Sequence, residues 1–237
     1  MPYFYMMSNP YYLIGTILVS IGALFMMYAQ SRVSTNYAKY SKVQNQRNIT
    51  GFEVAREMLD QNGLYDITIH EVKGKMSDHY NPKTKSVHLS TQVYHDTSIA
   101  SLAIAAHEVG HAIQHSKSYQ PLIFRNAILP FCNAGQSIGW IVIMVGLLFS
   151  NMSLAWIGIL LMSGILLFQI VTLPVEFDAS SRALDVLKTN YLTTNEVSGA
   201  KSMLSAAALT YVAAMLATLL SLLRIVLLVV GNNRDEL

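Results

Sequence analysis

The sequence predicts a mainly α-helical integral membrane protein, with about four transmembrane helices and a small α+β polar domain. Hydrophobic residues make up 52% of the chain and charged residues 13%, whereas soluble proteins average about 25% charged residues. The shortage of charge is concentrated in one region, since no Asp, Glu, Lys or Arg occurs from Asn126 to Val175. Apolar runs of that length are typical of transmembrane helices.

The first expected span is Tyr11–Ala29. As a helix it would be roughly 28 Å long, which matches the hydrocarbon core of a bilayer at about 30 Å. A cleaved signal peptide is the alternative, but such a peptide begins with basic residues. Residues 2–10 carry no charged side chain, which favours an uncleaved membrane anchor.

The charge-free run divides into two expected spans, Phe131–Phe149 and Leu154–Leu173, joined by a polar turn at Ser150–Ser153. A long buried helix pair in a soluble protein is the alternative, and the complete lack of charge disfavours it. The last expected span is Met203–Val230, in which the side chain of Arg224 can snorkel to the interface.

Basic residues set the expected orientation. The segment before the first span has none, and the segment after it has four before any acidic residue, namely Arg32, Lys39, Lys42 and Arg47. The positive-inside rule then places residues 31–130 in the cytoplasm, and two further spans return residues 174–202 to the same side. The predicted segments are therefore 1–30, 31–130, 131–173, 174–202 and 203–237. Side chains before and after the hairpin formed by the two central spans can therefore meet at one site.

Charge and cysteine content exclude other classes. The net charge of +2 indicates no nucleic-acid partner. Cys132 is the single cysteine, so it cannot form an internal disulfide, and its apolar neighbours indicate plain burial.

The first polar segment predicts a small α+β fold. Thr50 and Glu53 have the spacing of a capping box, which begins a helix that Gly63 closes. Two strands follow. Apolar residues alternate roughly in Ile67–Val72 and again in Val87–Leu89, and a turn is expected between them at Asn81–Thr84. The second strand is expected either to present an edge to an extended substrate or to face the core.

A helix from about Ile99 to Gln114, capped by Thr97 or Ser98, contains the stretch A-A-H-E-V-G-H-A-I-Q-H-S. His107 and His111 lie four residues apart and share a helix face, so both can bind one ion at about 2.0–2.1 Å. Glu108 is next to that face, where it can reach a water molecule without binding the metal. A small sheet followed by a metal-bearing helix is a common zincin plan.

His115 forms a rival pair with His111. Ala112 follows His111, however, so this pair has no general base beside it. His107 and His115 would be about 12 Å apart along the helix axis and cannot bind the same ion. His115 is therefore expected near the site or in solvent, and substrate binding is its other interpretation.

The third metal ligand has to come from another part of the chain. The metzincin pattern is excluded, because it needs Gly and His where this chain has Gln114 and Lys117. The downstream acids are Glu176, Asp178, Asp185, Glu196, Asp235 and Glu236.

Glu176 is the preferred third ligand, because it is the first acid after the hairpin and the preceding Pro174 suits a helix start. Asp178 is the alternative ligand, and a solvated acid at a helix N-terminus is the other interpretation of Glu176. Glu196 is expected to cap the last helix.

Other polar residues have two interpretations each. Asp178 is a candidate partner for a ligating histidine, and Arg182 on the same helix is a candidate to pair with a carboxylate or a developing oxyanion. An ordinary surface Asp–Arg pair is the alternative for both. His79 and Tyr80, expected on the loop between the strands, are either oxyanion stabilisers or surface polar groups.

The motif H-E-V-G-H, the charge-free double span and the segment E-F-D-A-S-S-R-A-L closely resemble the YugP-type bacterial membrane zinc metallopeptidases. The segments S-D-H-Y at 77–80 and A-A-A-L-T-Y-V-A at 206–213 are also similar to that family. The resemblance covers nearly the whole chain. It implies a neutral zinc endopeptidase in a bacterial plasma membrane, with His107, His111 and Glu176 as ligands and Glu108 as the base.

The arrangement is also similar to that of HtpX-type and prenyl-protein endopeptidases, in which a membrane hairpin separates the two motifs. Those enzymes carry an aspartate four residues after the third ligand, whereas this chain has Ser180. The expected function is hydrolysis of peptide bonds in membrane-associated proteins at the cytoplasmic face, by a gluzincin-like site with HExxH plus Glu. The expected partners are that protein substrate and the lipid bilayer.

Two alternative functions fit the sequence less well. A site-2-type intramembrane protease would need its HExxH inside a span, but the apolar stretch Ile99–Ala106 is too short and Asp96 and Lys117 flank it. An inactive, zinc-stabilised membrane scaffold is the second alternative. The intact Glu108 argues against it, because a purely structural site needs no base beside it.

Overall fold

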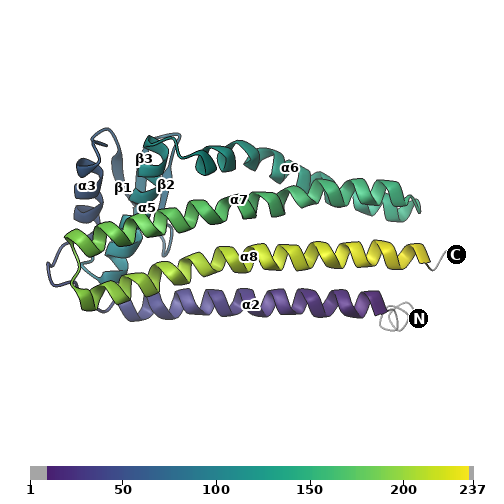
Figure 1. Cartoon of the computed structure of the whole chain (residues 1–237), viewed down its shortest axis with the longest axis horizontal. Coiled ribbons are helices and arrows are strands. Elements are labelled where there is room, and N and C mark those ends of the chain that lie inside the picture. Colours follow the sequence, from purple (N-terminus) through teal and green to yellow (C-terminus); the bar gives the residue numbers. More distant parts are fainter. Residues whose placement is uncertain (1–9, 235–237) are drawn as a thin grey trace. The chain divides into compact units, whose positions relative to one another are not determined.

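The computed structural model describes residues 10–234. Its elements run in the order α2 (Pro10–Tyr40), α3 (Gly51–Gln61), β1 (Thr68–Val72), β2 (His79–Asn81), β3 (Ser86–Ser90), α4 (Thr91–His95), α5 (Ile99–Ser116), α6 (Gln120–Leu148), α7 (Met152–Asn190) and α8 (Thr194–Arg234) (Figure 1). They form two compact units. Within the described residues, one unit contains the chain up to Ala29, Phe124–Thr172 and the chain from Thr210. The other contains Gln30–Ile123 and Leu173–Leu209 and is called the polar unit below.

Among residues 10–234 four helices, α2, α6, α7 and α8, are long and apolar enough to cross a membrane, which confirms the predicted fold class. The short turn between the two central spans is also present, because α6 ends at Leu148 and α7 begins at Met152. The two helices of this hairpin lie close together. A Cβ atom added to Gly139 would be 2.7 Å from the carbonyl oxygen of Gly158, so only glycine fits there.

One helix boundary differs from the prediction. Pro174 was expected to begin a helix, but it lies inside α7, which runs without a break from the apolar span into the polar segment. Proline removes one backbone hydrogen bond, yet it is more frequent in transmembrane helices than in soluble ones. As a consequence, Glu176 lies inside a continuous helix and not at a helix start.

The start of the polar unit follows the predicted capping chemistry. The Thr50 side chain accepts a bond from the backbone N–H of Glu53 at 3.2 Å, and the Glu53 carboxylate accepts one from the Thr50 N–H at 2.7 Å. Helix α3 ends at Gln61, just before Gly63, which has a positive φ of 72°. The predicted capping role of Glu196 is also confirmed, since it accepts bonds from the N–H and hydroxyl of Thr193.

The sheet has three strands in the order β1-β3-β2, with β1 parallel and β2 antiparallel to β3. Strand β2 was not predicted. His79 and Tyr80 were expected on a loop, and a strand of three residues is too short to show alternation. The hypothesis that Val87–Leu89 forms an edge is wrong, because β3 is the central strand and both side chains are fully buried.

Helix α5 packs on the side of the sheet that carries the buried Val87 and Leu89, within one hydrophobic core. Ser98 caps it, as its hydroxyl accepts a bond from the Ser101 N–H at 3.2 Å. The helix ends at Ser116, about one half-turn beyond the predicted end. Its burial gives the histidines a fixed backbone.

Candidate metal centre

His107 and His111 lie on one face of α5, as their four-residue spacing predicts. Their rings meet edge to face, with centroids 4.7 Å apart. The two side chains are only 14% and 12% exposed. Imidazoles with so little access to water need polar partners.

Glu176 on α7 supplies the partner of both rings, and its side chain is 4% exposed. Its Oε2 atom is 3.3 Å from His107 Nε2 and 3.5 Å from His111 Nε2. Ligands at 2.0–2.2 Å from one tetrahedral zinc ion are separated from one another by about 3.3–3.5 Å. The three ligand atoms therefore have the mutual spacing that a zinc ion requires, and they lie within 4.8 Å of one another.

Gly110 allows the two helices to approach this closely. A Cβ atom at this position would be 2.8 Å from the carbonyl oxygen of Ala179 on α7. Even alanine would push the helices apart, because real Cβ atoms essentially never come within 3.0 Å of another heavy atom. The glycine of H-E-V-G-H thus positions Glu176 opposite the two histidines.

Gln114 orients His111 from the side away from Glu176. Its side chain is fully buried, and its Oε1 lies 3.0 Å from His111 Nδ1. Its Nε2 donates to the carbonyl oxygen of Val175 and to Asp178 Oδ2, both at 2.8 Å. Since the amide nitrogen is the donor in two bonds, the amide oxygen is left to accept from His111 Nδ1–H. With Nδ1 engaged in this way, Nε2 is the ring atom that faces Glu176 Oε2 at 3.5 Å, and it is the atom available to bind an ion.

His107 has a comparable partner in Ser180, whose Oγ lies 3.2 Å from His107 Nδ1. The similarity to HtpX-type and prenyl-protein endopeptidases would have placed an aspartate at this position. The hydroxyl reaches the same ring nitrogen without adding a charge, so both imidazoles have their Nδ1 atoms occupied by this chain.

Asp178 and Arg182 complete a chain of polar contacts behind the cluster. Arg182 donates to both carboxylate oxygens of Asp178, at 2.6 and 3.2 Å. Asp178 in turn accepts from Gln114, which contacts His111. The structure therefore connects Asp178 to a histidine through Gln114 rather than directly, and it engages Arg182 with that carboxylate.

The electrostatics of the cluster favour a cation. Burial alone would lower the pKa of His111, but its bond to Glu176 and the negative charges of Glu176 and Glu108 outweigh burial and raise it. The negative charges that favour a proton on His111 also favour a divalent ion at this place, and metal binding would displace that proton.

Glu108 follows His107 on α5 and is 9% exposed. Its side chain is rotated by about 100° from that of His107, on the flank of the metal-binding face. Its assignment as a base that does not bind the metal stays a prediction.

The remaining predicted residues lie apart from the three ligand atoms. The His79 ring stacks on His88 with centroids 4.5 Å apart, and its Nδ1 lies 2.8 Å from the Ser77 carbonyl oxygen. The Tyr80 hydroxyl lies 2.8 Å from His115 Nδ1. Burial, and to a lesser extent Asp66, raises the pKa of Tyr80 to about 12, so its hydroxyl stays neutral.

Other acids are not part of the described cluster. Asp178 is engaged by Arg182, and Glu196 caps α8. Asp235 and Glu236 lie outside the described residues. Sequence reasoning missed Gln114 and Gly110 as parts of the site. The only local signal was that Gln114 lies three residues after His111, which puts both on neighbouring positions of one helix face.

A buried His–His–Glu cluster, in a chain with four helices of membrane-spanning length, defines a membrane-associated metalloprotein with a zinc-peptidase type of site. The chain matches the family described as "Putative neutral zinc metallopeptidase" over residues 15–230, and it belongs to that family. Zinc is accordingly the metal for which this cluster is suited.

A curated relative is similar over nearly the whole length. The chain is 44% identical over 222 residues to the "Putative membrane protease YugP" of Bacillus subtilis (strain 168), covering 93% of this chain and 98% of that protein. No solved structure matches the chain significantly.

The role of Gln114 can be tested with Gln114→Leu in the purified full-length protein. We expect zinc affinity to fall about 10–100-fold, because His111 loses the group that orients its ring. Competition with a chromogenic chelator would measure this. Gln120→Leu is the matched control, since Gln120 is exposed at the start of α6. Equal zinc affinities for the two variants would contradict the orienting role.

Proposed function

We propose that this chain is a multi-pass zinc endopeptidase of the bacterial plasma membrane, which hydrolyses peptide bonds of membrane-associated proteins at the cytoplasmic face. The observation that carries this proposal is the convergence of His107 Nε2, His111 Nε2 and Glu176 Oε2 beside Glu108. Three protein ligands leave a fourth tetrahedral position open, which is the mark of a catalytic rather than a structural zinc site.

In this proposal His107, His111 and Glu176 bind the ion, and the ion supplies Lewis acidity that activates water near neutral pH and polarises the scissile carbonyl. Glu108 accepts the proton of the attacking water and later passes it to the leaving amine. Its limited exposure supports this role, because few bulk water molecules compete for its carboxylate.

Asp178 and Arg182 have positioning roles in this proposal. The two bonds from Arg182 to Asp178 favour this role over the alternative in which Arg182 meets a developing oxyanion. Together with Gln114 they hold the His111 ring, while Ser180 holds that of His107. Preorganised ligands of this kind cost no rearrangement when the ion binds.

The oxyanion stabiliser is assigned to Tyr80 rather than to His79. A neutral hydroxyl is a hydrogen-bond donor at any physiological pH, and Tyr80 retains its proton up to about pH 12. His79 is engaged by the Ser77 carbonyl oxygen and stacks on His88, which supports a structural role in the sheet.

Charge and chain order support a cytoplasmic site in this proposal. All pieces of the polar unit, Gln30–Ile123 and Leu173–Leu209, come after an odd number of the four candidate spans. They therefore share one side if each span crosses once. The basic residues Arg32, Lys39, Lys42 and Arg47 assign that side to the cytoplasm.

No observation favours the alternative functions. A site-2-type protease would carry its HExxH in a span, but among the described residues α5 is not one of the helices apolar enough to cross a membrane. An inactive scaffold would leave the flanking position of Glu108 without a purpose.

The base can be tested with Glu108→Gln, which keeps the size of the side chain and removes its proton affinity. We expect zinc content and thermal stability to be retained, and the turnover of a degenerate peptide library to fall about 10²–10⁴-fold. Glu57→Gln is the control, because Glu57 is an exposed acid on α3. Undiminished cleavage by the Glu108 variant would show that another group is the base.

Sidedness can be tested with reporter fusions after Asn45. We expect a fluorescent reporter that folds in the cytoplasm to be active and an alkaline phosphatase fusion to be inactive. The opposite pattern would place the polar unit, and with it the site, outside the cell.

A further inference from the structure

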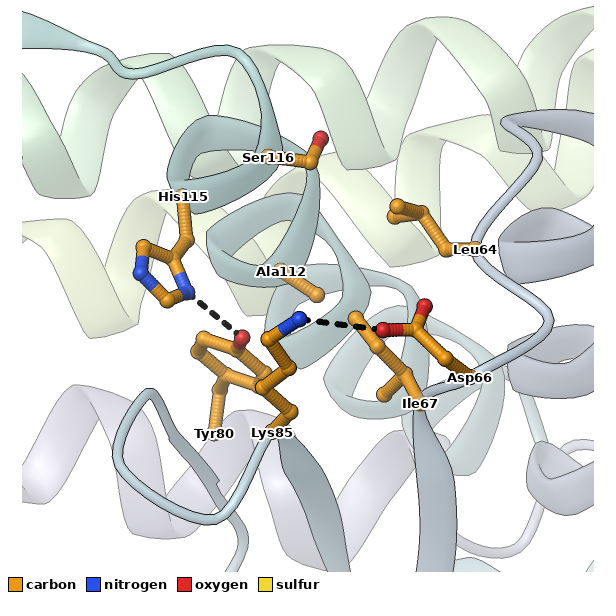
Figure 2. Close-up of a pocket in the computed structure, with 8 residues that line it drawn as sticks. All are labelled: Leu64, Asp66, Ile67, Tyr80, Lys85, Ala112, His115 and Ser116. Carbon is orange, nitrogen blue, oxygen red and sulfur yellow. Dashed lines mark hydrogen bonds and ion pairs between the residues drawn. The ribbon is translucent and has the colours of Figure 1, made fainter.

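A cavity lies beside the metal-bearing helix, with a volume of about 230 Å³. Figure 2 shows the side chains that line it, which come from α5, from β2, from the turn before β3 and from the segment that precedes β1. They are Leu64, Asp66, Ile67, Tyr80, Lys85, Ala112, His115 and Ser116. Neither the family match nor the similarity to the curated relative assigns a role to this cavity.

The α5 residues that line the cavity lie on the same helix faces as Glu108 and His111. Ala112 and Ser116 follow Glu108 at intervals of four residues, and His115 follows His111 at the same interval. Residues four apart share a helix face. The cavity therefore lies one to two turns beyond the proposed base, on the same side of the helix.

The sheet brings the cavity next to an open edge. Strand β2 is at the end of the strand order, and among the described residues it pairs with β3 alone. The ring of His79 stacks on His88, so Tyr80 points to the opposite face, where its hydroxyl meets His115 (Figure 2). A peptide extended along β2 would direct every second side chain toward that face.

The lining combines apolar and polar side chains. Leu64, Ile67 and Ala112 supply apolar surface, and the last two are buried. Lys85 Nζ pairs with Asp66 Oδ2 at 3.1 Å, with both side chains 61% exposed (Figure 2). Because these two charges compensate each other, they attract neither sign of charge strongly.

We propose that this cavity is the specificity pocket for a large apolar side chain of the substrate, of the Leu, Met or Phe class, close to the scissile bond. The proposal rests on the function proposed above. The volume supports it, since an apolar cavity of about 150 Å³ already binds benzene. Tyr80 and His115 are mutually bonded, and together they form one wall of the cavity.

Two opposite changes in pocket size provide the test. Ala112→Leu reduces the cavity and Leu64→Ala enlarges it, while Lys83→Ala changes an exposed residue of the neighbouring turn that does not line it. The zinc-loaded full-length enzyme and each variant would digest a degenerate library of peptides, with the cleavage sites read by mass spectrometry. Zinc content is measured for every variant.

We expect wild type to prefer Leu, Met or Phe at one position beside the cleaved bond. Ala112→Leu should shift that position toward Ala or Ser by roughly 10-fold or more in relative kcat/KM, and Leu64→Ala should shift it toward Phe or Trp. Preferences at the other positions should not change, and Lys83→Ala should match wild type.

The two proposals fail in different ways. Cleavage by wild type with no opposite shift in the two size variants overturns the pocket assignment alone. A wild-type preference for a charged side chain that follows neither size change does the same. A lack of any cleavage by the zinc-loaded wild type overturns the proposed function, and the pocket assignment with it.

Discussion

The contact between α5 and α7 at Gly110 and Ala179 is the constraint on which the site depends. It lets Glu176 reach both His107 and His111, which belong to a segment on the other side of the helical hairpin in the sequence. Because α7 is helical on both sides of Pro174, Glu176 is held by a helix rather than by a loop. Sites on rigid elements hold their geometry more closely than sites on loops.

The polar groups around the cluster show how few charges are needed to orient two imidazoles. Gln114 satisfies His111 while it is itself held by the Val175 carbonyl and Asp178. Ser180 satisfies His107 with a neutral hydroxyl. Every one of these partners lies on α5 or α7, so an ion bound at the cluster would stabilise the packing of the two helices as well as the site.

The sequence predicts those parts of the fold and of the site that depend on residue spacing within one element. The capping box at Thr50 and the shared face of His107 and His111 follow from spacing alone, and burial and hydrogen bonds confirm both helices. The three-residue strand β2 was missed because it is too short for a pattern. The bridging role of Gln114 depends on which α7 residues it meets, and the Ser180 contact with His107 likewise depends on tertiary packing. No periodicity in the sequence encodes either one.

The most direct test of the account is the zinc position in an anomalous difference map, recorded at the zinc absorption edge from crystals of the zinc-loaded full-length protein. We expect one peak at about 2.0–2.2 Å from His107 Nε2, His111 Nε2 and a carboxylate oxygen of Glu176. A peak bound by His111 and His115, or one far from Glu176, would contradict it.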